Sequence, residues 1–171
     1  MKRKLFIILT LISVALSTWA MPPQQPEKSE AEKFVQNLAK IKSDEISYAY
    51  ISANMFKQLF IKIDLDEEMQ ESISFIKSLK SLRRFFTNGK QGYDVMKATL
   101  KPFLQENEEV LGMTLMASNR DGGGMAAIYS GQGNTLVVTD YGNNETITLV
   151  FVAGLSYEAF MEFKDLGIDF Y

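Results

Sequence analysis

Apolar and polar residues alternate with a period of two from Glu109 to near the C-terminus. That period is typical of β-strands with one buried face. Short stretches rich in glycine and asparagine interrupt the alternation, as they do in hairpins. The pattern therefore predicts an antiparallel meander of four strands, at residues 110–117, 125–130, 135–141 and 146–152.

Before Glu109 the apolar residues recur mainly at helical spacing. The spacing predicts amphipathic helices around residues 34–41, 53–63, 69–76 and 93–104, and one more at residues 157–161. Pro102 is expected to bend or shorten the helix in which it lies. Residues 46–52 and the run from about Leu82 to the turn at Asn88-Gly89 predict one or two N-terminal strands.

Helices on one side of an antiparallel sheet define the expected fold class. It is an α+β domain of two layers, in which the C-terminal four-stranded meander and one or two N-terminal strands pack against amphipathic helices. Because 171 residues suit a single domain, residues 31–171 are expected to form it.

The alternation divides the meander into two faces. The first is strongly apolar and is expected to lie under the helices; it holds Leu111, Met113, Leu115, Ile128, Leu136, Val138, Ile147, Leu149 and Phe151. The second, named here the candidate sheet face, is unusually apolar for a surface in water, as a partner site would be. Its candidate binding residues are Met116, Tyr129, Val137, Tyr141, Val150 and Val152. A covering helix, or the β-propensity of these residue types, would explain the same composition.

The N-terminal twenty residues have the organisation of an export signal. Lys2, Arg3 and Lys4 precede an apolar stretch at residues 5–15, and Thr18 and Ala20 suit a cleavage site. Residues 21–30 hold three of the four prolines and are expected to form an extended tether. The chain is therefore expected to be periplasmic or secreted, with no stable transmembrane segment after signal removal. An uncleaved membrane anchor is the alternative.

The composition of the chain excludes several kinds of catalytic and binding site. The chain contains neither His nor Cys, which excludes a Ser-His-Asp triad, a thiol nucleophile, a disulfide and a lipobox cysteine. Its formal net charge is −3, and removal of the basic signal would make it more acidic. An acidic chain is a poor general binder of nucleic acid, so no nucleic-acid partner is expected.

Three constellations could still carry chemistry, and each has a plainer interpretation. Ser74 and Lys77 match a Ser-x-x-Lys pair without its companion motifs. The acidic residues at 64–68 could hold a cation, but acids in the first turn of a helix also suit its dipole. A basic cluster could bind a phosphate, a glycan or an acidic protein face, or it could be a solvated strand edge; it comprises Lys77, Lys80, Arg83, Arg84 and Lys90. No catalytic residue, metal or cofactor is predicted.

Several stretches carry a family resemblance. They are residues 46–56, residues 76–83, the run from Ala127 through residues 135–138, and residues 149–154. In these residues and in their order, the chain resembles the small exported Gram-negative proteins grouped as domain of unknown function 4252. The likeness spans about residues 30–165. It implies export and a compact α+β domain, and it supplies neither an established activity nor catalytic residues. Many members carry a lipobox cysteine after the signal, which this chain lacks.

These observations support three hypotheses of function. The leading one is a non-enzymatic envelope module that binds another protein, such as another envelope protein, or an envelope component. The alternative is a carrier or sensor of a small apolar ligand, held between the Met- and Phe-rich helices and the sheet. The third, an enzyme that uses carboxylates or the Ser74–Lys77 pair, has the least support in the sequence.

Overall fold

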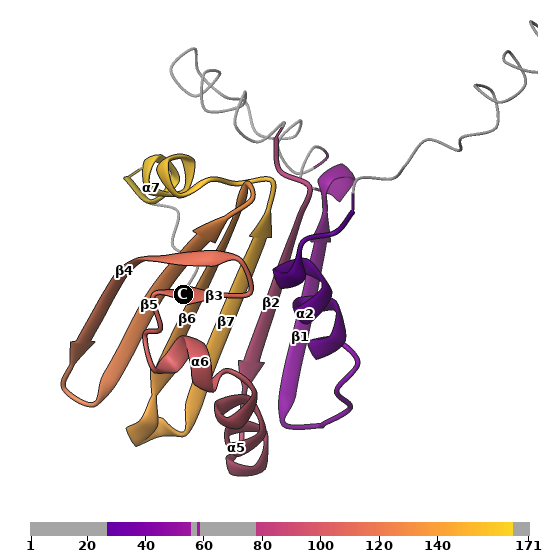
Figure 1. Ribbon diagram of the computed structural model, residues 1–171. Coiled ribbons are helices and arrows are strands. Elements are labelled where there is room, and N and C mark those ends of the chain that lie inside the picture. The colour runs from indigo at the N-terminus through magenta and orange to yellow at the C-terminus, as the bar shows by residue number, and fades with distance from the viewer. Residues whose placement is uncertain (1–26, 56–57, 59–77, 166–171) are drawn as a thin grey trace, which may run out of the picture.

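The computed structural model of the protein describes residues 27–55, 58 and 78–165, with the side chains of residues 162–165 excepted. An antiparallel sheet and several helices make it an α+β fold, as the sequence predicts (Figure 1). The helices are α2 (Glu30–Leu38), α5 (Lys90–Thr99), α6 (Lys101–Leu104) and α7 (Tyr157–Asp165). The strands are β1 (Ile46–Ser52), β2 (Ser81–Thr87), β3 (Glu109–Val110), β4 (Met113–Asp121), β5 (Gly124–Gly131), β6 (Asn134–Tyr141) and β7 (Thr146–Ala153), and a 3-10 turn η1 (Gly142–Asn144) precedes β7.

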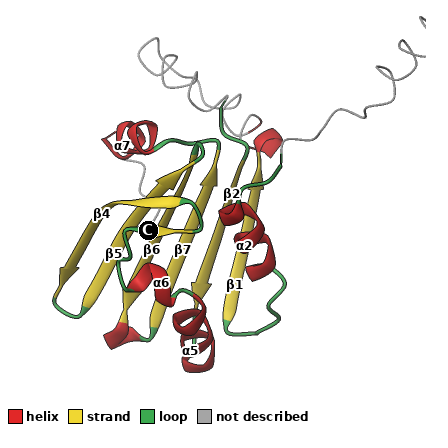
Figure 2. Ribbon diagram, in the orientation of Figure 1, coloured by secondary structure: helices red, strands yellow, loops and turns green. Residues whose placement is uncertain are grey.

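The sheet has seven strands in the order β1-β2-β7-β6-β5-β4-β3, and every neighbouring pair is antiparallel. Strands β3 to β7 follow one another as hairpins. The last of them, β7, returns to lie beside β2, so the two parts of the chain join in one sheet (Figure 2). This pairing leaves β1 at one edge of the sheet and β3 at the other.

The expectation of four meander strands plus one or two others was wrong in number. The predicted strand at 110–117 is split by a turn at Leu111-Gly112, where both residues have positive φ, 55° and 68°. Two consecutive positive φ values define the type I′ turn that closes two-residue hairpins, and glycine adopts them without strain. The chain therefore reverses there and adds the two-residue strand β3 to the sheet.

The predicted helix at 93–104 also divides in two. Leu100 adopts φ −93° and ψ 7° and ends α5, and Pro102 lies in the first turn of α6. Proline lacks the N–H that a continuous helix would need at this position, but it is tolerated in a first turn. Pro102 therefore shortens the helix, which is one of the two effects expected of it.

One face of the sheet, named here the helix-covered face, is covered by α2, α5 and α6 (Figure 1). The main core lies between this face and the three helices. Phe85, Leu136, Leu149 and Phe151 contribute to it from the central strands, and all are nearly inaccessible to solvent. The helices contribute further buried side chains: Val35, Leu38, Met96 and Phe103. The other side of the sheet, the opposite face, carries a smaller core that includes Phe160 of α7.

Thr87, at the end of β2, joins β2 to the start of β7. It is fully buried; its hydroxyl oxygen accepts the N–H of Ile147 at 2.8 Å, and the hydroxyl donates to the carbonyl of Glu145 at 3.4 Å. The N–H of Ile147 lies in the interior, where an unpaired polar group is costly.

Thr87→Val keeps the shape of this side chain but removes its hydrogen bonds. We expect it to lower the free energy of unfolding by about 1–3 kcal/mol, because the N–H of Ile147 stays buried without its acceptor. Urea denaturation measures the change. Thr87→Ser, which keeps the hydroxyl, is the matched control and should lose less; equal losses in the two variants would contradict the role assigned to the hydrogen bond.

Some predictions fall outside the described residues. They are the export signal at residues 1–20, most of the tether, the acidic residues at 64–68, the helix at 69–76 and the Ser74–Lys77 pair. Of the helix predicted at 53–63, residues 53–55 and 58 are described and are helical. Ser29 caps α2, which begins at Glu30, the last residue of the predicted tether. In the described part of the chain, no helix is long and apolar enough to cross a membrane.

Candidate functional site

Three residues of the candidate sheet face lie together, but inside the protein. Val137 pairs with Val150 across β6 and β7, and Val152 follows on the same face. Their exposed fractions are 3%, 2% and 1%. They belong to the smaller core of the opposite face, whose other buried members are Leu79, Leu82, Leu155 and Phe160. These valines are therefore packed within the domain and present no free surface.

Tyr129 lies on the other side of the sheet, so its assignment to the candidate sheet face is corrected. It pairs with Leu136 on the helix-covered face, is fully buried, and its hydroxyl donates to the carbonyl of Phe103 at 3.1 Å. Its ring meets that of Phe103 edge to face, with 5.0 Å between centroids. Burial raises the pKa of the Tyr129 hydroxyl, and the charge of Glu106 adds to the effect.

Ile128 consequently lies on the opposite face, where the sequence had placed Tyr129. Alternation shows that two residue sets exist in β5, but both sets are apolar enough to face a core. Tyr129 has the larger side chain, and its hydroxyl can reach the carbonyl of Phe103 in α6. It therefore packs beneath the helices, and Ile128 lies on the opposite face.

Met116 and Tyr141 are the exposed members of the candidate sheet face, with exposed fractions of 42% and 46%. Met116 is the extra residue of a β-bulge, since Leu115 pairs with Tyr129 and Ala117 pairs with Ile128. Tyr141 ends β6 and pairs with Gly124. The six residues thus divide into three buried valines, one core tyrosine and two exposed side chains, and they do not form one exposed surface.

Replacement of a buried valine by a charged residue should therefore strongly destabilise the domain. We expect Val150→Asp to lower the free energy of unfolding by on the order of 3 kcal/mol or more, because a carboxylate would be buried without a partner. Tyr141→Asp, on the exposed end of β6, should change it by less than about 1 kcal/mol. Thermal denaturation followed by circular dichroism compares the two, and a stable Val150→Asp variant would show that this face is accessible.

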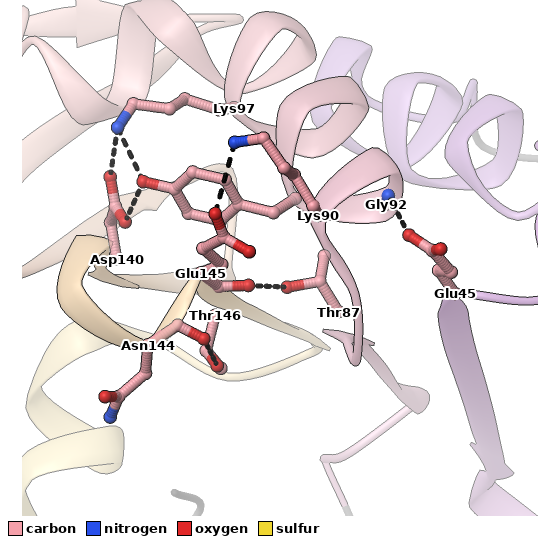
Figure 3. A network of polar contacts seen from close by, with 10 residues as sticks. Glu45, Thr87, Lys90, Gly92, Lys97, Asp140, Asn144, Glu145 and Thr146 are labelled. Atoms are coloured by element: carbon pink, nitrogen blue, oxygen red, sulfur yellow. Dashed lines mark hydrogen bonds and ion pairs between the residues drawn. The ribbon is translucent and has the colours of Figure 1, made fainter.

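A polar network joins α5 to β6 (Figure 3). The hydroxyl of Tyr93 donates to Oδ1 of Asp140 at 3.0 Å, and Nζ of Lys97 donates to the Tyr93 oxygen at 2.6 Å. Lys97 also lies 3.5 Å from Oδ2 of Asp140 and over the Tyr93 ring. The three groups therefore satisfy one another.

The groove next to this network is lined by charges of both signs. Two adjoining hollows of about 430 and 920 Å³ share Lys97, Arg120 and Asp140. Arg120 is itself held by Glu106, at 3.0 Å, and by the carbonyl of Leu104, at 2.9 Å. The hydrogen bond that Lys97 donates to the Tyr93 oxygen raises the pKa of Lys97; burial opposes this effect, and the charge of Asp140 adds to it. A lysine with a raised pKa stays protonated at neutral pH, so Lys97 is suited to an ion pair and not to proton abstraction.

The start of α5 is held by carboxylates from two other segments (Figure 3). Glu45 accepts the N–H of Gly92 at 2.8 Å, and Glu145 accepts a hydrogen bond from Lys90 at 3.1 Å. A carboxylate at a helix N-terminus is favourable because the free N–H groups there point at it. A Cβ on Gly92 would lie 2.6 Å from the carbonyl oxygen of Glu45, so glycine permits this approach.

The pKa of Lys97 provides a test of the network. In Tyr93→Phe we expect the pKa of Lys97 to fall toward its ordinary value, because the largest cause of its increase is removed. NMR titration of the lysine side-chain signals measures the shift, with Lys97→Met used to assign the Lys97 signal. A pKa of Lys97 that is unchanged in Tyr93→Phe would contradict the hydrogen bond as its cause.

A second candidate surface lies on the edge strand β1. Tyr48 and Tyr50 have exposed fractions of 43% and 45% although both belong to a strand of the sheet. The guanidinium of Arg83, on the neighbouring strand β2, lies 5.0 Å from the centroid of the Tyr50 ring, and Tyr48 packs on Phe85 at 4.8 Å. We call Tyr48, Tyr50 and Arg83 the tyrosine edge.

Arg84 extends this region onto the opposite face. The register pairs Arg83 with Tyr50 and Arg84 with Ala49, so the two arginines project to different faces of the sheet. A small hollow of about 250 Å³ adjoins Arg84 and is lined by Ser47, Tyr48, Ala49, Arg84 and Phe86. Among the described residues, neither guanidinium has a carboxylate within ion-pair distance.

Sequence reasoning identified these arginines but neither the tyrosine edge nor the network at Lys97. The i, i+4 spacing of Tyr93 and Lys97 is a signal for a contact on one helix face. Asp140 comes from a distant strand, which spacing does not reveal. For the tyrosine edge the available signal was the alternate placement of Tyr48 and Tyr50; which edge of the sheet they occupy depends on the strand order.

Comparison with known proteins identifies one family. The family described as domain of unknown function (DUF4252) matches residues 40–159 of the chain. The match covers β1 to β7 and the first turn of α7, and so includes the groove beside Lys97 and the tyrosine edge. No curated protein and no solved structure matches the chain.

Proposed function

The chain belongs to the DUF4252 family, and we propose that this member is a non-enzymatic module that binds another protein of the bacterial envelope through the tyrosine edge. The envelope location is part of the proposal and rests on the export-signal pattern of residues 1–20.

The observation that carries the proposal is that large apolar side chains are exposed on β1 and on the residues that flank it in sequence. Among the described residues, seven large hydrophobic side chains are exposed, and four of these lie between residues 41 and 55: Ile41, Tyr48, Tyr50 and Met55. Tyrosine and arginine are enriched in protein interfaces, because their flat side chains bury much area and still form polar contacts. The tyrosine edge combines both residue types on a strand at the border of the sheet.

The burial of the three valines argues for a binding surface other than the candidate sheet face. The candidate sheet face offers Met116 and Tyr141 to a partner, while its valines are occupied within the core. The tyrosine edge has two adjacent exposed rings and a nearby cation. We therefore place the binding surface at β1.

The non-enzymatic part of the proposal is supported by the sequence and by the polar network. The chain has neither His nor Cys. The Lys97 ammonium is committed to Tyr93 and Asp140, and its raised pKa opposes a role as a base. The alternative function, a carrier of a small apolar ligand, gains no specific support: described methionines and phenylalanines such as Met96 and Phe103 are packed in the core.

Capture from envelope extract tests this function. The full chain, expressed with its N-terminal segment and recovered from the envelope, is cross-linked in extract, and captured proteins are identified by mass spectrometry and then bound again in purified form. We expect Tyr48→Ser combined with Tyr50→Ser to weaken binding of the purified partner at least tenfold, because both aromatic anchors are lost.

The matched control is Tyr141→Ser, which removes an equally exposed tyrosine from another part of the sheet. Circular dichroism establishes that both variants fold. If the double variant binds the partner as well as the wild type does, or if the control loses binding equally, the tyrosine edge is not the binding surface.

A further inference from the structure

The backbone of β1 presents every second peptide group to its outer side. In the β1–β2 ladder the N–H of Asn88 donates to the carbonyl of Glu45 at 2.9 Å, and the N–H of Ala53 donates to the carbonyl of Lys80 at 3.0 Å. Hydrogen-bonded pairs alternate with non-bonded pairs in an antiparallel ladder, so the odd-numbered residues of β1 bond to β2. The N–H and C=O groups of Tyr48 and Tyr50 therefore point away from β2, and no described strand lies beyond them.

The two edges of the sheet differ in how far they are protected from further pairing. At one edge β3 is two residues long, and β4 beside it carries the bulge at Met116 and the charged pair Arg120 and Asp121. Short strands, bulges and charges are the usual devices that block edge-to-edge pairing. The seven residues of β1, Ile-Ser-Tyr-Ala-Tyr-Ile-Ser, include no charge, no proline and no bulge, and its central residues 47–50 are exposed.

We infer that the outer edge of β1 accepts an extended acidic segment of the partner protein, which pairs with Tyr48 and Tyr50 as an added strand of the sheet. The inference rests on the proposed function and names the chemistry of the partner. In strand addition, backbone hydrogen bonds supply affinity while side-chain contacts on alternate faces supply specificity.

Charge is the argument for an acidic occupant. Arg83 and Arg84 flank β1 on its two faces, neither strand of the pair contains an acidic residue, and no described carboxylate pairs with either guanidinium. Arginine binds carboxylates through a planar fork of donors. A second copy of this chain, paired through its own β1, would instead bring more guanidinium groups to the same region.

The side chains beside the edge provide contacts on both faces of an added strand. On the helix-covered face an incoming side chain would meet the exposed rings of Tyr48 and Tyr50. On the opposite face it would meet the hollow of about 250 Å³ beside Arg84 and Phe86. Carboxylates at two consecutive positions of the segment would project to both faces and reach one arginine each.

A peptide series tests strand addition directly. The probe is a fluorescein-labelled, end-capped peptide of sequence Thr-Val-Thr-Glu-Glu-Val-Thr-Val, titrated with the full chain and followed by fluorescence anisotropy. Two versions are N-methylated at alternate residues, one at the odd and one at the even positions. We expect one methylated version to bind within threefold of the parent and the other to bind at least tenfold more weakly, because an added strand bonds through one alternate set of N–H groups. Equal binding, or equal loss, in the two versions overturns the inference.

Matched variants test the preference for an acidic peptide and the location of the binding site at β1. A Lys-Lys version of the peptide should bind at least tenfold more weakly than the Glu-Glu parent. Arg84→Gln should weaken binding of the parent at least fivefold, while Arg120→Gln, at the protected edge, should leave it unchanged. Equal binding of the acidic and basic peptides overturns the acidic specificity, and self-association of the chain that Tyr50→Pro abolishes identifies a second copy as the occupant and also overturns the inference.

These outcomes are separate from those of the proposed function. A partner that is captured through the tyrosine edge, together with a peptide series that shows no alternation, leaves the function standing and removes strand addition. Alternation in the peptide series without a captured partner leaves strand addition standing and removes the envelope partner.

Discussion

The pairing of β2 with β7 is the constraint on which the rest of the structure depends. It joins the N-terminal pair β1–β2 to the C-terminal hairpins, and Thr87 holds the junction through the N–H of Ile147 at 2.8 Å. Because β7 then has a strand on each side, its residues from Ile147 to Ala153 are buried. Helix α5, which follows β2, packs back onto the same sheet. Its Tyr93 donates a hydrogen bond to Asp140 of β6, and the N–H of Gly92 near its N-terminus donates to Glu45, just before β1. The same pairing leaves β1 at an edge.

Local patterns predicted the elements well, and long-range pairing accounts for most of what they missed. The bounds of β1 agree with the prediction, β2 begins one residue before it, and the α+β class is confirmed. The split at Leu111-Gly112 was missed because an apolar residue in a left-handed conformation has no pattern of its own. The face of Tyr129 was wrong because both alternating sets of β5 are apolar. The burial of Val150 depends on Leu82, far away in sequence, and on Phe160 of α7, and both contact it only after the sheet is assembled.

The functional proposal follows from the difference between the two borders of one sheet. Val137 and Val152, which were predicted to lie on a surface, are buried, while the uncharged strand β1, predicted only as a strand, is exposed at the edge of the sheet. Arg83 and Arg84, for which a solvated strand edge was one interpretation, lie on β2, the strand next to the edge strand β1. Their side chains project to the two faces of the sheet. Exposed aromatic rings, peptide groups that pair with no described strand and two guanidinium groups without a described carboxylate partner therefore coincide in one region. A single extended acidic ligand would contact all three.

Hydrogen exchange at individual amides of β1 is the most direct test of this account. NMR of the free protein should show fast exchange at Tyr48 and Tyr50 and slow exchange at Ala49 and Ile51, because the two sets of N–H groups point to different sides of the strand. On addition of the binding partner, exchange at Tyr48 and Tyr50 should slow at least tenfold while Ala49 and Ile51 change little. Exchange at Tyr48 and Tyr50 that stays fast in the complex would contradict the central claim, since the partner would then bind elsewhere or without joining the sheet.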